Sequence, residues 1–445
     1  MKIFFVSLGC DKNLVDSEMM LGELSKAGHT ITDSEDDADC VVINTCGFIG
    51  DAKKESIDTI IQFGNLKKEG KLKAIVVTGC LAERYTNEIK TSLPEVDAIL
   101  GTMAIDEIVK ACEDAVNGKR NEIKKPLDGS MVYGLKRLVT TGGHYAYLKI
   151  AEGCDKRCTY CAIPFMRGKY RSVPMEVLLK EARDLADFGV KELILVAQET
   201  TLYGKDLYGE KSLHKLLSEL SKIDEIKGIR ILYCYPEEIY PELVSEIKNN
   251  KKVLHYLDMP IQSASDNVLK RMGRRTNEKE LVERIKDLRR EIPDICLRTT
   301  LIAGFPGETH KDFKKTLSFV KEMKFDRLGV FTYSREEGTK AAELPGQVFK
   351  FIMMLRRNSI MKAQQEIAYK KAESEVGKVF TCLVEGKLPE DNVYVGRTYK
   401  DAPNVDGFIF FDSARDLMSG DIVDVKVTGA DKYDLLGVIN DEFTE

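Results

Sequence analysis

The first part of the chain alternates short apolar runs with amphipathic helical segments. The runs KIFFVS, CVVINT and AIVVTG are largely apolar, which is typical of buried strands. Between the first two runs, Leu14, Leu21 and Leu24 recur at helical spacing, and the segment stops at Gly28. This β-α-β-α-β order predicts a parallel α/β domain over residues 1–118.

A second alternating series follows a polar stretch. The sequence NGKRNEIKKPLDG is rich in turn-forming residues and predicts a linker over residues 119–139. Beyond it, six apolar strands alternate with helical segments, and we expect a partial parallel (β/α)6 barrel over residues 140–372, because a complete barrel has eight strands. The expected strands cover residues 145–150, 192–197, 229–234, 256–261, 295–302 and 328–333.

The pattern changes again after a charged helical stretch. The segments TCLVEGKL, NVYVGRTY, GFIFF, DIVDVKVTGA and LLGVIN are short, rich in valine and isoleucine, and separated by turns. They predict a small antiparallel β-barrel over residues 373–445. The fold class is therefore α/β, with three domains of which only the last is all-β.

Composition indicates a folded chain that does not depend on disulfides. Of the 445 residues, 43% are hydrophobic and 31% are charged, which excludes disorder and a fibrous repeat. The N-terminal sequence lacks the pattern of a signal peptide, and no run of ~18 apolar residues occurs. We therefore expect a cytoplasmic protein without membrane association, in which the eleven cysteines need an interpretation other than disulfides.

Three cysteines form one tight group, here called the barrel triad: Cys154, Cys158 and Cys161. Three thiolates within eight residues repel one another unless a cation holds them, and soft sulfur ligands select zinc, copper or iron–sulfur clusters. No second CxxC and no closely following histidine supplies the fourth ligand that a structural zinc site needs. The spacing favours an iron–sulfur cluster with one open iron, over zinc and over simple packing.

A second set, the N-terminal triad, consists of Cys10, Cys46 and Cys80, each of which follows an expected buried strand. The carboxyl ends of parallel strands lie at one edge of a sheet, so the three thiols are expected to converge on a second metal site. The alternative is three separate buried thiols. The other five cysteines lie singly in apolar or helical patterns and are expected to pack in the core: Cys40, Cys112, Cys234, Cys296 and Cys382.

These motifs resemble those of radical S-adenosylmethionine (SAM) enzymes, and over the whole chain they resemble the methylthiotransferases of that group. The resemblance rests on SLGCDKNLVDSE, INTCGFI, TGCLAERY, AEGCDKRCTYCAIPFMRG, LIAGFPGET and YSREEGT. It implies SAM and two [4Fe–4S] clusters as cofactors. The N-terminal triad would hold an auxiliary cluster that handles sulfur, the barrel triad would hold the cluster that binds SAM, and the last domain would be a TRAM-type barrel.

The expected SAM contacts are polar residues at strand ends and one glycine-rich loop. A carboxylate after the second strand can accept from the SAM ammonium group, and an arginine on the fifth strand can pair with the SAM carboxylate. The alternative is that these residues cap the barrel and that LIAGFPGET is an ordinary turn. The candidates are Gln198, Glu199, Gln262, Ser263, Arg298, Gly304, Pro306 and Gly307.

Two branches of the family act on different substrates: one methylthiolates adenosine in tRNA, and the other an aspartate of small-subunit ribosomal protein twelve. The stretch GCDKNLVDSE resembles the ribosomal-protein branch, whereas the tRNA branch usually has Gln-Met-Asn after the cysteine. Two positions depart from the ribosomal-protein pattern, which usually has aspartate at Glu199 and histidine at Ser263.

Charge is a second guide to the substrate. Residues 373–445 carry 7 Lys and Arg against 16 Asp and Glu, whereas the preceding 372 residues carry 60 against 56. An acidic barrel repels RNA phosphate and suits a basic ribosomal protein, although a merely solvated acidic face is the alternative. The acidic surface is expected at Asp401, Asp406, Asp412, Asp416, Asp421 and Asp424.

We therefore expect an enzyme that adds a methylthio group to the β-carbon of an aspartate in ribosomal protein twelve. Its partners would be that basic protein and a reductant such as flavodoxin or ferredoxin, without tight binding of nucleic acid. The alternatives are a tRNA adenosine methylthiotransferase and a non-enzymatic iron–sulfur protein that binds RNA or transfers electrons.

Overall fold

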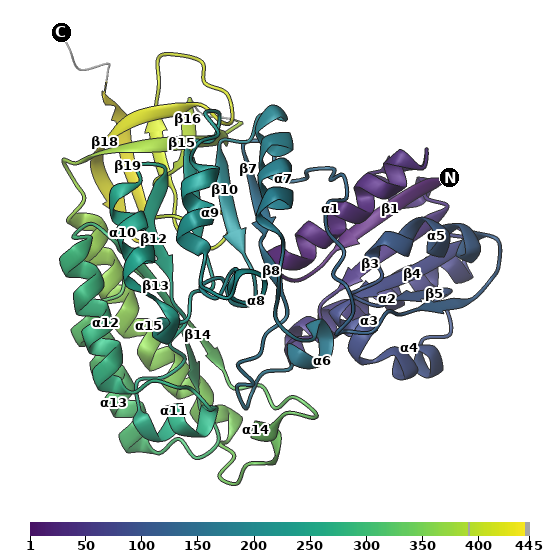
Figure 1. Cartoon of the computed structure of the whole chain (residues 1–445), viewed down its shortest axis with the longest axis horizontal. Helices are drawn as coiled ribbons and strands as arrows, with labels where there is room; N and C mark the ends of the chain where they lie inside the picture. Colours follow the sequence, from purple (N-terminus) through teal and green to yellow (C-terminus); the bar gives the residue numbers. More distant parts are fainter. Residues whose placement is uncertain (390–391, 441–445) are drawn as a thin grey trace.

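The N-terminal domain is a six-stranded parallel sheet covered by helices (Figure 1). The computed structural model describes residues 1–389 and 392–440. The sheet order β2-β1-β3-β4-β5-β6 confirms the predicted parallel arrangement of the first three apolar runs. The strands are β1 (Lys2–Ser7), β2 (Thr30–Thr32), β3 (Cys40–Thr45), β4 (Ala74–Gly79), β5 (Ala98–Leu100) and β6 (Asn121–Ile123), and the helices are α1 (Asp11–Lys26), α2 (Gly50–Lys68), α3 (Cys80–Arg84), α4 (Thr86–Ser92) and α5 (Ile108–Val116).

The segment expected as a linker is tied to its neighbours. Its residues 121–123 form the edge strand β6, so the N-terminal sheet continues past residue 118. Farther along, the backbone amide of Leu138 donates to the Glu18 carbonyl of α1, and the buried Arg137 guanidinium pairs with Glu18 and Glu181. The segment therefore fastens α1 to the next domain.

The middle domain is an open sheet of six parallel strands in the order β14-β13-β12-β11-β10-β7, which is the expected partial barrel. The strands lie within a few residues of their predicted positions: β7 (Tyr145–Lys149), β10 (Glu192–Val196), β11 (Gly228–Ile231), β12 (Val253–Asp258), β13 (Cys296–Ala303) and β14 (Arg327–Thr332). Helices cover the outside of this sheet (Figure 1): α7 (Met175–Asp187), α9 (Leu213–Leu220), α10 (Pro241–Asn249), α12 (Glu278–Glu291), α13 (His310–Met323) and α15 (Lys350–Glu373). The short helices α8 (Lys205–Tyr208), α11 (Asp266–Met272) and α14 (Lys340–Glu343) lie in the loops that connect these elements.

An insertion after β7 faces the N-terminal domain. It contains the two-stranded hairpin of β8 (Ala151–Glu152) and β9 (Arg171–Ser172), with the short helix α6 (Pro164–Arg167) between these strands. In Figure 1, α6 lies between the two large sheets, beside α3. The barrel triad is part of this insertion.

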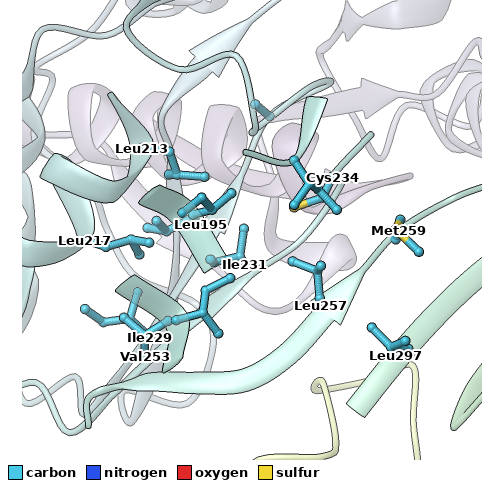
Figure 2. Close-up of a cluster of buried hydrophobic side chains, with 14 of the residues drawn as sticks. Leu195, Leu213, Leu217, Ile229, Ile231, Cys234, Val253, Leu257, Met259 and Leu297 are labelled. Atoms are coloured by element: carbon cyan, nitrogen blue, oxygen red, sulfur yellow. The ribbon is translucent and has the colours of Figure 1, made fainter. Parts of the chain in front are cut away.

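The core of the partial barrel is apolar and continuous from its strands to its covering helices. Leu213 and Leu217 of α9 pack over the strand residues Leu195, Ile231 and Leu257 (Figure 2). Cys234 lies in the same cluster, and all five lone cysteines are buried, as the sequence predicts. Burial on this scale is the main stabilising contribution to such a domain.

A second core joins two domains across α1. Val15 and Met19 of α1 share one buried cluster with Tyr147, Val196 and Tyr256 of the partial barrel. The polar face of α1 is buried as well, including Asp16 and Glu18. The helix that the sequence presents as amphipathic is therefore enclosed on both faces, and the N-terminal domain is fixed against the barrel.

The C-terminal domain is a closed barrel of five strands in the order β15-β16-β17-β19-β18. Four of its pairings are antiparallel, as predicted, but the β17–β19 pairing is parallel, because the chain crosses to β18 before it returns beside β17. The strands are β15 (Val379–Lys387), β16 (Val393–Arg397), β17 (Ile409–Asp412), β18 (Ile422–Asp431) and β19 (Asp434–Ile439). In the part of the chain that the structure describes, no helix is long and apolar enough to cross a bilayer.

Buried charges attach this barrel to the middle domain. The Glu192 carboxylate of β10 receives Arg230 Nε at 2.7 Å and Arg397 Nη1 of β16 at 2.8 Å, and all three side chains are almost fully buried. The pKa of Glu192 is lowered, since the two guanidinium groups outweigh the effect of burial. Glu192 is the carboxylate that Arg230 and Arg397 share, and Arg397 also pairs with Glu385 of β15.

Two of the six aspartates expected on the acidic surface belong to this attachment instead. Asp401 is buried against Arg327 of β14, and the Asp406 carboxylate accepts a hydrogen bond of 2.7 Å from Tyr256 of β12. Their side chains are 4% and 3% exposed. The expectation of a surface role was wrong for these two residues, because ion pairing with the middle domain takes up their charge.

We expect Glu192→Ala to destabilise the protein strongly. The substitution leaves two buried guanidinium groups without their shared anion, a defect that costs roughly 3–5 kcal/mol. Calorimetric unfolding of Glu192→Ala and of Glu242→Ala, an exposed control in α10, measures the difference. Equal unfolding temperatures for the two variants would contradict a structural role for this ion group.

Candidate functional site

The N-terminal triad gathers at the carboxyl ends of three adjacent strands. Cys10 follows β1, Cys46 follows β3 and Cys80 follows β4, and these three strands are neighbours in the sheet. Gly9 has a φ of +94°, and a Cβ there would lie 2.8 Å from the Cβ of Cys46. A Cβ on Gly47 would lie 2.9 Å from the Cys80 carbonyl carbon. Glycine at these positions lets the three cysteine loops approach one another.

The three thiols of this triad differ in their surroundings. Cys46 and Cys80 are buried, and Cys10 is exposed. Burial, followed by the neighbouring Cys80 and Cys10 thiols, raises the pKa of Cys46 to about 12. A thiol in such a place becomes a thiolate when a cation takes up its charge.

The barrel triad lies in the loop between β8 and α6. The Gly153 amide donates to Gln198 Oε1 at 2.9 Å, and the Cys154 amide donates to the Gly168 carbonyl at 3.2 Å, which fixes the start of the loop. Burial raises the pKa of Cys154 to about 12, with a further contribution from the nearby Glu199 carboxylate. Three thiols again share one small, largely buried space.

Both triads fit iron–sulfur clusters better than a single metal ion. Within residues 1–389 and 392–440, no three His, Cys, Asp or Glu side chains are close enough to hold one ion. Thiolates on a cluster bind different irons and therefore stand farther apart than the ligands of one ion. All-thiolate donor sets are typical of four-iron clusters, and three ligands leave one iron open.

The two triads adjoin across the domain boundary. Cys80 packs in one buried cluster with Ala162 and Met166, and Ala162 directly follows Cys161. The sequence places each triad at a strand end of its own domain but does not predict that the two strand ends face each other. The structure brings them together.

Glu199 is a buried carboxylate with an open acceptor. Its Oε1 accepts from the Thr201 side chain and backbone amide, whereas its Oε2 is buried without a hydrogen-bond partner in the described structure. Burial raises its pKa to about 8, although the Thr201 hydrogen bond opposes the rise. A buried unpaired oxygen calls for an explanation, and a ligand that donates a hydrogen bond supplies one.

The other polar candidates have partners within the protein. Gln198 Oε1 accepts from the Gly153 amide, and Gln198 Nε2 donates to the Glu152 carboxylate at 2.6 Å. The Ser263 hydroxyl lies 3.4 Å from that of Thr316, and Gln262 has a left-handed φ of 68°. Arg298 donates to Asp258, the last residue of β12, at 2.8 Å. Contact of these residues with SAM stays a prediction.

The glycine-rich loop after β13 packs against its own chain. Gly304 has a φ of +77°, and a Cβ there would lie 2.3 Å from Met353 of α15, while a Cβ on Gly307 would lie 2.4 Å from Arg271. The Pro306 carbonyl accepts from Arg271 Nε at 2.9 Å. These contacts explain the glycines without a ligand, and the approach of this loop to SAM also stays a prediction.

Sequence reasoning missed a buried ion cluster between the two triads, here called the interface ion cluster: Asp16, Lys149, Glu152 and Arg167. Lys149 and Arg167 each contact both carboxylates. Although burial opposes ionisation, Arg167 and then Lys149 hold the pKa of Glu152 at about 2. The signal in the sequence is the charged residues inside the apolar stretch YLKIAE and the Arg-Gly pair after AIPFM.

A large cleft lies elsewhere. It has a volume of about 890 Å³ and lies at the amino ends of the barrel strands, where Lys191, Lys227 and Lys251 precede β10, β11 and β12. Its other wall carries Phe380 and Tyr399 of the C-terminal domain. Parallel barrels place their chemistry at the opposite, carboxyl ends of the strands, where both triads lie.

Comparison with protein families assigns all three domains. Residues 2–101 match the uncharacterized protein family UPF0004, residues 148–320 match the radical SAM superfamily, and residues 376–439 match the TRAM domain. The last two matches agree with the partial barrel and the closed five-stranded barrel. The expected fold class is thereby confirmed.

Solved structures support the same fold. The radical SAM methyltransferase TsrM from Kitasatospora setae, with cobalamin and a [4Fe–4S] cluster bound, is similar over 88% of this chain and 80% of its own, at 13% identity and a TM-score of 0.54. The cobalamin-dependent radical SAM enzyme OxsB is similar over 81% of this chain and 56% of its own, at 15% identity and a TM-score of 0.52. At these identities the likeness concerns the fold alone.

Curated relatives are far more similar. The ribosomal protein uS12 methylthiotransferase RimO of Lachnoclostridium phytofermentans is 56% identical over 98% of this chain and 99% of its own length. The protein of the same name from Acetivibrio thermocellus is 52% identical over 99% of both chains. The chain therefore belongs to the radical SAM family of ribosomal protein uS12 methylthiotransferases.

Proposed function

We propose that this protein uses SAM to place a methylthio group on the β-carbon of an aspartate in ribosomal protein uS12. The observation that carries this function is full-length identity of up to 56% with uS12 methylthiotransferases, in a chain whose two cysteine triads adjoin at strand ends. A chain with one triad would suffice for SAM cleavage, whereas sulfur transfer needs a second centre close by.

The two triads provide six thiolate ligands. Cys154, Cys158 and Cys161 hold the SAM-binding [4Fe–4S] cluster, and the N-terminal triad holds the auxiliary one. When bound, SAM and the two clusters supply the carbon radical and the sulfur that insertion at an unactivated C–H bond requires. The buried positions of Cys46, Cys80, Cys154 and Cys158 limit the access of water and oxygen to the two clusters.

Two side chains that follow β10 bind SAM and orient the start of the barrel-triad loop. Glu199 Oε2, which is buried and has no hydrogen-bond partner in the described structure, accepts from the SAM ammonium group. Gln198 holds the Gly153 amide and so fixes the entry to the barrel triad. The remaining proposed contacts of SAM are Gln262, Ser263, Arg298 and the loop of Gly304, Pro306 and Gly307.

The negative charge of the C-terminal barrel marks the surface that binds the substrate protein. Asp412, Asp416 and Asp424 are exposed on the C-terminal barrel and present negative charge to a basic ribosomal protein. The same charge disfavours tight binding of free nucleic acid. A reductant such as flavodoxin or ferredoxin supplies electrons, and a cytoplasmic location suits the substrate.

Anaerobic reconstitution should load about eight irons per chain, because two four-iron clusters bind six thiolates. The triple variant Cys154→Ala, Cys158→Ala, Cys161→Ala should retain roughly half of that iron. Replacing the buried lone cysteines Cys40, Cys234 and Cys382 with Ala is the matched control and should leave the iron content unchanged in the folded fraction. An intact protein with about four irons, unaffected by the first triple substitution, would exclude two clusters.

The triple variant Cys10→Ala, Cys46→Ala, Cys80→Ala should separate cleavage from transfer. It should still form 5′-deoxyadenosine from SAM under reducing, oxygen-free conditions, because the barrel triad is intact, but it should form no methylthiolated uS12. Mass spectrometry of uS12 and of tRNA, incubated with wild type and variant, measures both products.

Wild-type modification of tRNA instead of uS12 would establish the tRNA alternative. Absence of SAM cleavage by the fully loaded wild type would establish the non-enzymatic one. Loss of cleavage in the variant, while its barrel cluster is retained, would contradict the division of roles.

Charge reversal on the C-terminal barrel should slow substrate binding without affecting SAM. The variant Asp412→Lys, Asp416→Lys, Asp424→Lys should associate with uS12 roughly tenfold more slowly at low salt, and the difference should vanish at high salt. The control variant Glu225→Lys, Glu242→Lys, Glu322→Lys makes the same charge change at exposed positions of the middle domain. Equal association rates for both triple variants would show that the barrel surface does not select the substrate.

A further inference from the structure

Arg167 reaches from the barrel domain into the N-terminal domain. It is the last residue of α6 and lies six positions after Cys161 in the same insertion. Its side chain is buried and ends among residues of α1 and α3. The insertion that carries the barrel triad therefore places a guanidinium group beside the N-terminal triad.

All of the donating nitrogens of Arg167 have partners. Its Nη1 donates to Asp16 at 2.6 Å and to Glu152 at 3.1 Å, and its Nη2 donates to Asn13 Oδ1. Its Nε donates to the sulfur of Cys80 at 3.3 Å. This guanidinium is thus held by two carboxylates and one amide in an orientation that directs its Nε–H at a cysteine sulfur.

The charge of the interface ion cluster is balanced without Cys80. Asp16 and Glu152 supply two negative charges, and Lys149 and Arg167 supply two positive ones. A Cys80 thiolate adds a negative charge to this buried space, and Arg167 is the residue of the cluster that touches it. Burial raises the pKa of the Cys80 thiol, and the adjacent Arg167 opposes that rise.

We infer that Arg167 is a positioning residue for the auxiliary cluster. Arg167 ties the Cys80 sulfur to the loop of the barrel triad and raises the reduction potential of the auxiliary cluster. The inference rests on the proposed function, which assigns Cys80 as a ligand. Hydrogen bonds to cluster sulfurs stabilise the more negative, reduced state, so they raise the potential. Arginine suits this task because its planar fork serves several acceptors in fixed directions.

The test measures the auxiliary cluster directly. In the full chain with Cys154→Ala, Cys158→Ala and Cys161→Ala, the auxiliary cluster alone contributes to a redox titration followed by electron paramagnetic resonance. Arg167→Gln should lower its midpoint potential, and Arg167→Lys, which keeps the charge but not the Nε donor, should lower it by less. The matched control is Lys149→Gln. Lys149 is a cation of the same interface ion cluster, but it contacts Asp16 and Glu152 and not a sulfur.

In the chain with both triads, Arg167→Gln should reduce methylthiolation of uS12 by roughly tenfold, a loss typical of outer-shell partners of metal ligands. Formation of 5′-deoxyadenosine should stay within about twofold of wild type, because the barrel triad keeps its own ligands. This separation distinguishes loss of a positioning contact from general damage to the fold, which would lower both products together.

The outcomes separate the inference from the proposed function. If the background chain holds no cluster, the assignment of Cys80 fails and the inference falls with it. If the cluster is present but Arg167→Gln and Lys149→Gln shift its potential equally, or neither shifts it, the inference alone is overturned. Should Arg167→Gln lose the cluster, Arg167→Lys decides: a lowered potential supports the inference and an unchanged one overturns it.

Discussion

Buried charge at the boundary between the first two domains is the constraint on which the site depends. Four buried ionised side chains lie there, two of each sign. Asp16 comes from the N-terminal domain, and Lys149, Glu152 and Arg167 come from the middle domain, so both cations keep their full compensation only while Asp16 stays in place across the boundary. Apolar contacts along α1 supply the stabilising burial, but apolar contacts tolerate sliding. The ion pairs of the interface ion cluster do not tolerate such a displacement, so they fix one arrangement of the two cysteine triads.

The geometry of parallel sheets explains why the triads can meet at all. Each domain ends its strands at one edge, and each triad follows strands at that edge. The short helices α3 and α6 then carry Cys80 and Arg167 across the gap between the edges. The partial barrel remains open between β7 and β14, and α1 packs against the β7 side, so the N-terminal domain closes a face that a complete barrel would close with its own strands.

The C-terminal barrel is attached by the same physical means at the opposite end of the strands. Glu192 joins Arg230 to Arg397, and Asp401 and Asp406 meet Arg327 and Tyr256. Part of the acidity counted along this domain is therefore internal. What remains exposed is a smaller set of aspartates on a domain whose position relative to the site is fixed, which suits a surface that holds a substrate protein while another domain does the chemistry.

The sequence by itself indicated most of the strands and the two sets of three cysteines. Apolar runs such as CVVINT and ELILV have the same character whatever surrounds them, and CxxxCxxC brings its thiols together through local spacing alone, so strands and triads were predictable. The parallel pairing of β17 with β19 was not, because strand patterns carry no direction. Nor did the pattern distinguish Asp401 from Asp416, since burial is a property of what packs above a residue. The contact of Arg167 with Cys80 joins residues 87 positions apart in different domains. Only tertiary structure decided it, because the energy of a buried charge depends on partners that the local sequence does not contain.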